Sequence, residues 1–270
     1  IRPDVALSLG LPETTRVFLG TQDQKSAALA AGISTETATI SLGTASAIST
    51  LSGRPQADAK MRIPCFALGQ ERWILESVVG TACVSLKWLR KMIAPNLDYA
   101  AMDRLAGAVT PGANGVFFYP HMEGAGTPFL QSGQHGSFHG LSLATEQADL
   151  IRALLEGIAY QVQTNLAVQE EINGAAIKEL RLFGGGSRSD LWCAIMAAVT
   201  KRRVLQMQTE LANFGAILLA AEGLGQGQQD GNRFAAVREP VKVFRPDPAK
   251  VRQYTAAYAQ YRALEDKLMA

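Results

Sequence analysis

Short apolar runs separated by tight turns occupy the first part of this chain. Two of them, Ala38–Leu42 and Ala45–Leu51, are joined only through Gly43 and Thr44, which predicts two strands in a hairpin-like pair. Strands joined so tightly run antiparallel, so the pattern predicts an antiparallel start to a sheet. Two further runs predict strands at Val17–Leu19 and Trp73–Glu76.

Later in the chain, apolar residues recur at helical spacing, as at Val84, Leu86 and Leu89, and alternate with strand-like runs. This alternation predicts an α/β domain with a mixed sheet and helices on both faces. The expected helices are Lys25–Ala31, Val84–Ile93, Tyr99–Ala108, Thr145–Asn173 with Thr145 as N-cap, Asp190–Thr200, Ala212–Gly223 and Pro248–Met269. The expected later strands are Gly115–Tyr119, Glu179–Phe183 and Arg203–Met207, and the expected loops are Glu123–Gly140 and Gly225–Gly231.

Composition narrows the class of protein. The 270 residues are enough for one large domain or two small ones, and 47% hydrophobic with 19% charged residues is ordinary for a compact protein. A net charge of +2 and the absence of Lys/Arg runs interleaved with aromatics argue against a nucleic-acid partner. No signal peptide or membrane-spanning run is visible, so we expect a cytoplasmic protein with no membrane partner.

Cysteine and histidine spacing gives no metal site. Cys65, Cys83 and Cys193 form no CxxC pair, which fits a reducing cytoplasm. His135 and His139 are four residues apart, but the glycines around them predict a loop. We therefore expect no metal ligands in the chain and a structural hydrogen-bonding role for its histidines.

The run Leu180–Asp190, LRLFGGGSRSD, carries the strongest functional signal. A buried strand passes through Gly184, Gly185 and Gly186 into a helix start, with Ser187 or Ser189 available as N-cap. Backbone without side chains lets a ligand lie flat, and the N–H groups of a helix start favour polar or anionic ligands. The run predicts a nucleotide site, although a plain turn gives the same letters.

Asp23 is the candidate for acid–base chemistry. It follows a predicted strand and a glycine, between the amides of Gln22 and Gln24, where strand ends often present reactive groups. Its carboxylate could accept the proton of an alcohol. An N-cap of the helix that begins at Lys25 is the commoner role for such a residue on sequence alone, and the two roles are compatible.

Other segments also carry two interpretations. The turn between Ser41 and Ser46 could hold phosphate oxygens or be a plain hairpin turn. In Glu210–Ala216, Gly215 allows a neighbour to approach closely, while Glu210 and Asn213 could simply cap the following helix. The loop Glu123–Pro128 could contact a ligand or a partner domain, with a solvated loop as the default; Trp73, Trp88 and Trp192 are expected in the core.

Six segments together resemble the second half of an FGGY-family carbohydrate kinase, of the xylulokinase and glycerol kinase kind. GTQDQKSAALAAG resembles the segment of the family's catalytic aspartate, SLGTASAIST its phosphate-contacting turn, and FGGGSRSDLWCAIMAAVTKRRV its adenosine motif. The likeness runs from about Val17 to Leu224 with the motifs in the family's order. The other three segments are FFYPHMEGAGTPF, LLEGIAYQV and ELANFGAILLA.

The resemblance implies a ribonuclease-H-like domain of the actin and hexokinase type, with ATP and Mg²⁺ as cofactors and a sugar or polyol as substrate. By motif, Asp23 would be the general base and Gln22 and Gln24 would be substrate-binding residues. A xylulose-like ketose is the suggested substrate. The ATP-binding residues would be Gly43, Thr44, Gly184, Gly185, Gly186 and Ser189.

The resemblance also implies a missing partner. The family's first domain opens with an Asp-x-Gly-Thr phosphate loop that this sequence lacks. We therefore expect residues 1–270 to be the C-terminal nucleotide-binding domain, with 1–16 as a partial linker from a missing N-terminal domain and a C-terminal helix over 245–270. The isolated chain is expected to be inactive, and a homodimer is a possible assembly.

Departures from the family pattern keep other interpretations open. Gly-Thr-Gln replaces three glycines before Asp23, and the arginine expected near Glu123 is absent. The alternative is an actin-like ATP-binding regulatory module, or a degenerate homologue, without sugar kinase activity.

Overall fold

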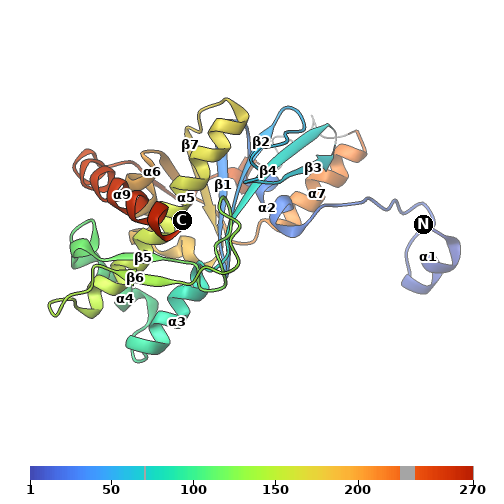
Figure 1. Ribbon diagram of the computed structural model, residues 1–270. Coiled ribbons are helices and arrows are strands. Elements are labelled where there is room, and N and C mark those ends of the chain that lie inside the picture. Colours follow the sequence, from blue (N-terminus) through green and yellow to red (C-terminus); the bar gives the residue numbers. More distant parts are fainter. Residues whose placement is uncertain (70, 226–234, 270) are drawn as a thin grey trace.

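A computed structural model describes residues 1–69, 71–225 and 235–269 (Figure 1). A seven-stranded sheet runs through it in the order β3-β4-β2-β1-β7-β8-β9. The strands β3, β4, β2 and β1 pair antiparallel, β1 and β8 pair parallel with β7, and β9 pairs antiparallel with β8. The mixed sheet with an antiparallel start is therefore confirmed. The strands are β1 (Thr37–Leu42), β2 (Ser46–Ser52), β3 (Cys65–Gly69), β4 (Arg72–Val79), β7 (Glu179–Phe183), β8 (Arg203–Gln206) and β9 (Lys242–Phe244).

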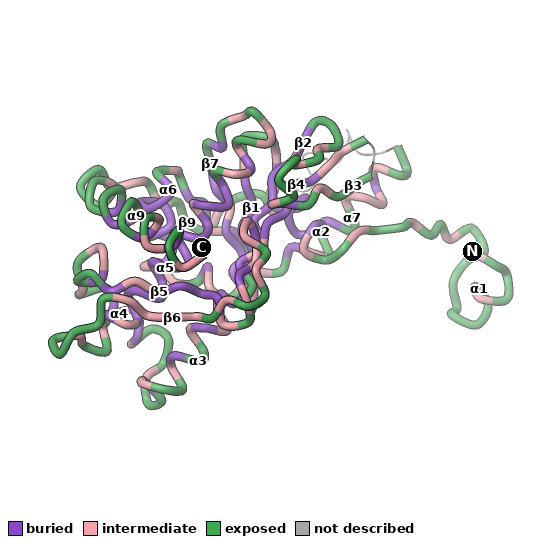
Figure 2. The backbone as a smooth tube through the Cα atoms, in the orientation of Figure 1, coloured by how far each residue is buried: buried purple, intermediate pink, exposed green. Residues whose placement is uncertain are grey.

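Helices cover both faces of this sheet, as expected. Successive side chains of a strand point to opposite faces, so Leu182 of β7 joins the large core while Phe183 joins a smaller cluster. The large core contains residues of α5 (Gln147–Asn173), α6 (Asp190–Thr200) and α9 (Pro248–Leu268), and the smaller cluster contains residues of α2 (Asp23–Ala30) and α7 (Ala212–Gly223). Figure 2 shows the buried backbone concentrated in the central strands and the helices beside them.

The connection between β4 and α5 contains more structure than the sequence predicts. It holds α3 (Cys83–Ile93), α4 (Tyr99–Ala108), a short 3₁₀ turn η1 (Ala113–Gly115) and a two-stranded sheet of β5 (Phe117–Tyr119) and β6 (Ser137–His139). The expected long loop thus contains β6, where Phe138 pairs with Phe118. The loop Glu123–Pro128 is not simply solvated, because Thr127 is buried and its hydroxyl accepts from the Val78 amide at 2.7 Å.

Several expected details are wrong. Val17–Leu19 forms no strand, because no described segment pairs with it, and Leu19 is 98% exposed. The N-cap of α5 is Glu146, not Thr145, since the Glu146 amide donates to the Asp149 carboxylate at 2.9 Å in a capping box. Trp88 is 38% exposed rather than part of the core, whereas Trp192 is fully buried.

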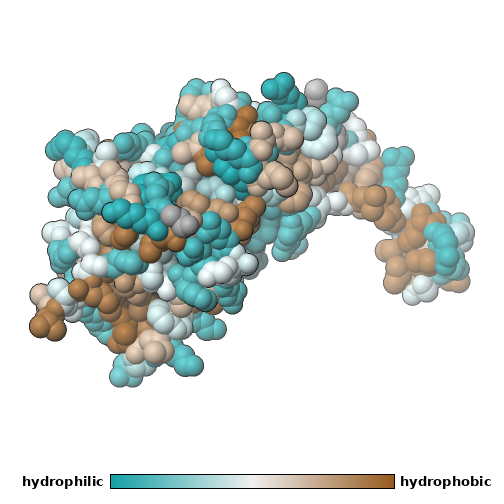
Figure 3. Space-filling view, in the orientation of Figure 1, coloured by the Kyte–Doolittle hydropathy of each residue, from teal (hydrophilic) through white to brown (hydrophobic). Residues whose placement is uncertain are grey.

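The two ends of the chain differ in their contacts. Within the expected linker 1–16, residues Pro3–Leu9 form a helix, α1, that stands away from the rest of the molecule (Figure 1). Part of its surface is apolar in Figure 3, and Leu7 is 85% exposed. The expected C-terminal helix over 245–270 is α9, whose described bounds are Pro248–Leu268. The short helix α8 (Ala235–Arg238) precedes β9, and the predicted turn Gly225–Gly231 lies outside the described residues except for Gly225.

Candidate functional site

Two turns meet at one edge of the sheet. Because β1 and β7 are parallel neighbours, with Ser41 opposite Phe183, their carboxyl ends lie side by side. Gly43 and Thr44 follow β1 and Gly184–Gly186 follows β7, and residues of both turns line a cavity of about 590 Å³. The structure thus brings together five of the six expected ATP-binding residues here: Gly43, Thr44, Gly185, Gly186 and Ser189.

The remaining walls of this cavity, which we call the glycine-turn cavity, come from α3, α4 and α6. Leu86, Tyr99 and Trp192 make much of the lining apolar, and Asp103 adds a carboxyl group. Burial raises the pKa of Asp103 above its usual value, against the lowering effect of a hydrogen bond to Ser189. Burial also raises the pKa of the Cys83 thiol to about 11, so this lining residue is a neutral thiol near pH 7.

The three glycines of the second turn have different physical roles. Gly184 has φ of 90°, and a Cβ on it would lie 2.8 Å from the Leu42 carbonyl oxygen. A Cβ on Gly186 would lie 2.8 Å from the Cys83 sulfur and 3.0 Å from the Trp192 ring. A Cβ on Gly185 would meet no described atom within 4 Å. Gly184 and Gly186 are therefore required by the fold, while Gly185 leaves an open surface beside the cavity.

The structure also decides between Ser187 and Ser189 as N-cap. Ser189 accepts a hydrogen bond from the Trp192 amide at 3.0 Å and is the N-cap of α6. The Ser187 hydroxyl instead donates to the Gly184 carbonyl at 2.8 Å, within the 3₁₀ turn η2 (Gly185–Arg188). Ser189 thus both begins α6 and lines the glycine-turn cavity.

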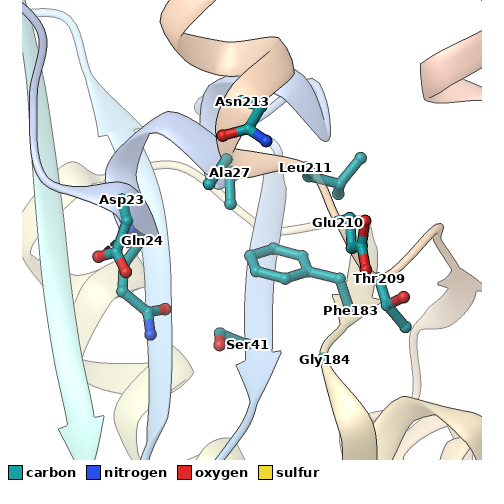
Figure 4. Close-up of a pocket in the computed structure, with 11 residues that line it drawn as sticks. Asp23, Gln24, Ala27, Ser41, Phe183, Gly184, Thr209, Glu210, Leu211 and Asn213 are labelled. Carbon is teal, nitrogen blue, oxygen red and sulfur yellow. Dashed lines mark hydrogen bonds between the residues drawn. The ribbon is translucent and has the colours of Figure 1, made fainter.

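Asp23 lines a second cavity, of about 320 Å³, on the α2 and α7 face of the same sheet edge (Figure 4). This carboxylate cavity also touches Ser41 and Gly184, which directly precede lining residues of the glycine-turn cavity. Figure 4 shows Asp23 at the start of α2 and Glu210 across the cavity, with the Phe183 ring between them. The carboxylate is therefore next to the place where the two turns meet.

Asp23 is not the N-cap of α2. That position belongs to Gln22, and Asp23 is the first helical residue, where an acidic side chain complements the helix dipole. Its carboxylate accepts from the Gln24 amide at 2.7 Å and remains exposed. The capping interpretation is therefore wrong, and the exposed carboxylate is free to contact a ligand.

The flanking amides differ in their surroundings. Gln22 is exposed, and its side-chain oxygen accepts from the Lys25 ammonium at 2.6 Å. Gln24 lines the carboxylate cavity, and its side-chain oxygen is buried without a partner among the described residues. Sequence analysis missed the buried pair of Lys25 and Glu76 and the carboxyl of Asp103. The one signal in the sequence for this ion pair is Lys25, a lysine among the small residues of the predicted helix.

Gly215 allows the close approach that the sequence predicted. A Cβ on this residue of α7 would lie 1.8 Å from the Ser26 carbonyl oxygen of α2. Neither Glu210 nor Asn213 caps α7, whose N-cap is Leu211; both side chains line the carboxylate cavity instead. The backbone contact between α7 and α2 thus helps to position the helix that carries Asp23.

A metal-binding cluster and a membrane-spanning helix are both absent from the residues that the structure describes. No group of three His, Cys, Asp or Glu side chains within this part of the chain is arranged to hold a metal ion. Among the described helices, none combines the length and apolar character that crossing a bilayer requires.

A mixed sheet with parallel central strands, helices on both faces and glycine turns at one edge is the ribonuclease-H-like fold of the actin and hexokinase class. The chain belongs to the FGGY family of carbohydrate kinases, and residues 38–224 match that family's C-terminal domain. The matched range contains both turns, while Asp23 precedes it.

Known relatives agree with this assignment. The chain is 28% identical to the gluconokinase of Bacillus subtilis over 236 residues, which is 83% of this chain and 46% of that protein. It is 28% identical to the xylulose kinase of the same organism over 263 residues, which is 96% of this chain and 52% of that protein. The crystal structure of xylulose kinase from Rhodospirillum rubrum superposes with a TM-score of 0.88 at 31% identity, covering 99% of this chain and 55% of that one. The chain spans about half the length of the curated relatives it matches.

Proposed function

We propose that this chain is the nucleotide-binding half of a carbohydrate kinase that transfers the γ-phosphate of ATP to a hydroxyl of a sugar or polyol. The observation that carries the proposal is the meeting of both turns beside the exposed carboxylate of Asp23, in a chain of the FGGY family. A nucleotide site needs a flat apolar slot and hydrogen-bond donors for the phosphates. Transfer of the γ-phosphate to a hydroxyl also needs a base near the transferred group.

The glycine-turn cavity suits ATP in one orientation. The adenosine would lie along Gly185 and Gly186 against Tyr99, near Ser189, where the walls are apolar. The phosphates would extend toward Gly43 and Thr44, at the end of the cavity next to β1. The carboxyl of Asp103 would repel phosphate, so the adenosine rather than the phosphates would lie beside it. An amino or hydroxyl group of the adenosine could donate a hydrogen bond to this carboxyl.

Asp23 would be the general base. The substrate hydroxyl would give its proton to the Asp23 carboxylate as its oxygen attacks the γ-phosphorus. The bond from that phosphorus to the oxygen of the departing ADP would break. Gln22 and Gln24 flank the carboxylate and would bind neighbouring oxygens of the substrate.

Magnesium would enter with the nucleotide. The described residues contain no cluster of three His, Cys, Asp or Glu side chains arranged to hold a metal ion. Mg²⁺ on the ATP phosphates would neutralise charge during transfer. No residue of the described chain is assigned to it.

We propose that a second, N-terminal domain completes the site. This chain matches about half the length of its relatives. Its sequence contains no Asp-x-Gly-Thr loop. That domain would supply the remaining phosphate contacts and most of the sugar-binding surface. The chain alone should therefore show weak turnover or none.

A phosphorylation screen tests the proposal. The chain, alone and together with an N-terminal domain of a relative, is assayed with ATP and with xylulose, gluconate or glycerol, the acceptors that the relatives' names indicate. We expect phosphorylation by the two-domain protein, with xylulose as the expected acceptor, and little by the chain alone.

Asp23→Asn separates a kinase from an ATP-binding module. In the two-domain protein we expect kcat to fall by roughly 100- to 10,000-fold, as for loss of a general base, with ATP affinity retained. Glu13→Gln, which changes another exposed acid, is the matched control. Full activity of Asp23→Asn would reject Asp23 as the base, whereas ATP binding without phosphorylation by the unmodified two-domain protein would favour the actin-like regulatory alternative.

A further inference from the structure

A buried ion pair lies behind the carboxylate that the proposed function uses as base. Lys25 of α2 is 4% exposed and Glu76 of β4 is 8% exposed, with their charged atoms 2.9 Å apart. The Ser49 hydroxyl donates to the other Glu76 oxygen at 3.3 Å, and the Lys25 ammonium lies 4.1 Å from the centre of the Phe66 ring. The pair, which joins α2 to β4, is thus also contacted by β2 and β3.

Lys25 has a second hydrogen bond, to the residue that precedes Asp23 in the chain. Its ammonium donates to the side-chain oxygen of Gln22 at 2.6 Å. An ammonium group has donors and no acceptor, so it can hold only the oxygen end of an amide. The Gln22 nitrogen, with its two N–H donors, is therefore the end of the side chain left for a ligand, next to Asp23 in the chain.

We propose that the Lys25–Glu76 pair is a positioning device that fixes the Gln22 amide with its N–H donors toward the substrate, and that Gln22 thereby selects for the substrate's chemistry. The inference rests on the proposed role of Asp23. Donors fixed beside the base favour a substrate with an oxygen acceptor next to the reacting hydroxyl, such as a carbonyl, carboxylate or hydroxyl oxygen. They disfavour a substrate with an ammonium group there, because two donors would face each other.

The energetics of buried ion pairs support a role other than stability. Removing two charges from water is costly, and well-packed apolar residues often replace such a pair at no cost in stability. An exposed glutamine without a fixed partner would also lose conformational freedom on binding substrate. The pair holds that side chain in one orientation before the substrate arrives.

A double-mutant cycle tests the device. In the two-domain protein, with xylulose as acceptor, Gln22→Ala should raise KM by roughly tenfold with little change in kcat, because uniform substrate binding is lost. The double variant Lys25→Met with Glu76→Leu should raise KM by a similar factor. Adding Gln22→Ala to that double variant should cause no further rise, since residues that act as a unit are not additive.

Two further variants separate positioning from folding. Lys25→Met alone leaves Glu76 buried without its partner and should lower the thermal midpoint, whereas the double variant should retain it. Gln22→Glu keeps an oxygen for Lys25 but removes both N–H donors, so it should raise KM with the fold intact. Gln22→Glu therefore carries the test even if the double variant fails to fold.

The outcomes distinguish this inference from the proposed function. Unchanged KM in Gln22→Glu and Gln22→Ala, or additive effects in the cycle, would overturn the positioning role while a loss of kcat in Asp23→Asn still supported the kinase. No phosphorylation by the unmodified two-domain protein would overturn both, and full activity of Asp23→Asn would overturn the role of Asp23 and with it the inference that rests on that role.

Discussion

The two faces of the sheet differ in how deeply their helices are buried. On one face, α6 buries almost all of its residues from Trp192 to Thr200, and α5 is buried along most of its length. On the other face, α2 buries Lys25–Ala30, but α7 buries only Gly215 and Ala221 among its residues. The deep face forms one wall of the glycine-turn cavity, while the shallow face carries Asp23. The base is thus carried by a buried helix, α2, whose neighbour α7 is largely exposed.

A glycine on each face makes the same kind of contact, which allows a direct comparison. Gly157 of α5 faces the Phe118 carbonyl oxygen, 2.1 Å from where a Cβ would be, and Gly215 of α7 faces that of Ser26 at 1.8 Å. Both helices therefore pack directly on backbone. The same substitution, glycine to alanine, probes the two faces with the same added atom.

Gly157→Ala should have the largest effect. The neighbouring residues Ile158 and Ala159 are 0% exposed, so α5 has no free space into which to move. Overpacking of a close-packed core costs about 1–3 kcal/mol and sometimes more, and we expect about 3 kcal/mol here, measured by urea unfolding. A change below about 1 kcal/mol would show that the deep face adapts, against the comparison.

Gly215→Ala should destabilise less but affect activity more. Because α7 is mostly exposed, it can shift away from α2, and we expect a loss of about 1–2 kcal/mol. That shift displaces the start of α2, so kcat of the two-domain protein should fall more than stability predicts. Gly107→Ala in α4 is the control: an added Cβ meets no described atom within 4 Å, so it should stabilise by about 0.5–1 kcal/mol.

The sequence predicts the helices of both faces better than the edge strands: α6 and α7 have the expected bounds. Long apolar periodicity places α5 and α6 correctly, because a buried helix needs a continuous apolar stripe. The edge strands β3 and β9 were missed, since a short edge strand is defined by backbone pairing with its neighbour rather than by its own apolar pattern.

The functional site also has one part that local sequence predicts and one part that it does not. The glycine turns follow from local sequence, because a turn between strand and helix requires residues without Cβ atoms. The Lys25–Glu76 contact does not, because its two partners are 51 residues apart and meet only through the sheet pairing. Local patterns thus predict the ligand-facing backbone, while tertiary contacts decide which side chains support the base.

The deep face should also make stability depend on pH. Burial raises the pKa of Glu265 in α9 to about 7, partly offset by Arg262 and Gln161, and burial lowers the pKa of nearby His121 to about 4. The folded protein thus holds the Glu265 proton that the unfolded chain releases near the ordinary glutamate pKa of 4.5. The contribution of Glu265 to stability is therefore lost as pH rises from about 4.5 to 7, on the order of 1–3 kcal/mol.

Glu265→Gln isolates this effect, since a neutral amide replaces the titrating group. The lowered pKa of His121 acts with the opposite sign: its contribution is lost as pH falls from 6.5 to 4. The free energy of unfolding is measured between pH 4 and 8. In Glu265→Gln the effect of His121 is no longer opposed, so this free energy should rise with pH from about 4 to 6.5. In the unmodified chain the loss of the Glu265 contribution opposes that rise. Asp266→Asn, 67% exposed and also paired with Arg262, is the control; identical curves for Glu265→Gln and the unmodified chain would reject the assignment.

Gly185→Ala should have the smallest effect on stability and the clearest effect on the nucleotide. An added Cβ meets no described atom, so the free energy of unfolding should change by less than about 0.5 kcal/mol. The same atom would lie on the open surface where the adenosine is proposed to rest, so ATP affinity, measured by calorimetry, should fall by roughly tenfold. Gly186→Ala is the matched contrast: its Cβ would be 2.8 Å from the Cys83 sulfur, so stability and affinity should fall together. Unchanged ATP affinity in Gly185→Ala would place the adenosine elsewhere and remove the reason for assigning the deep face to nucleotide binding.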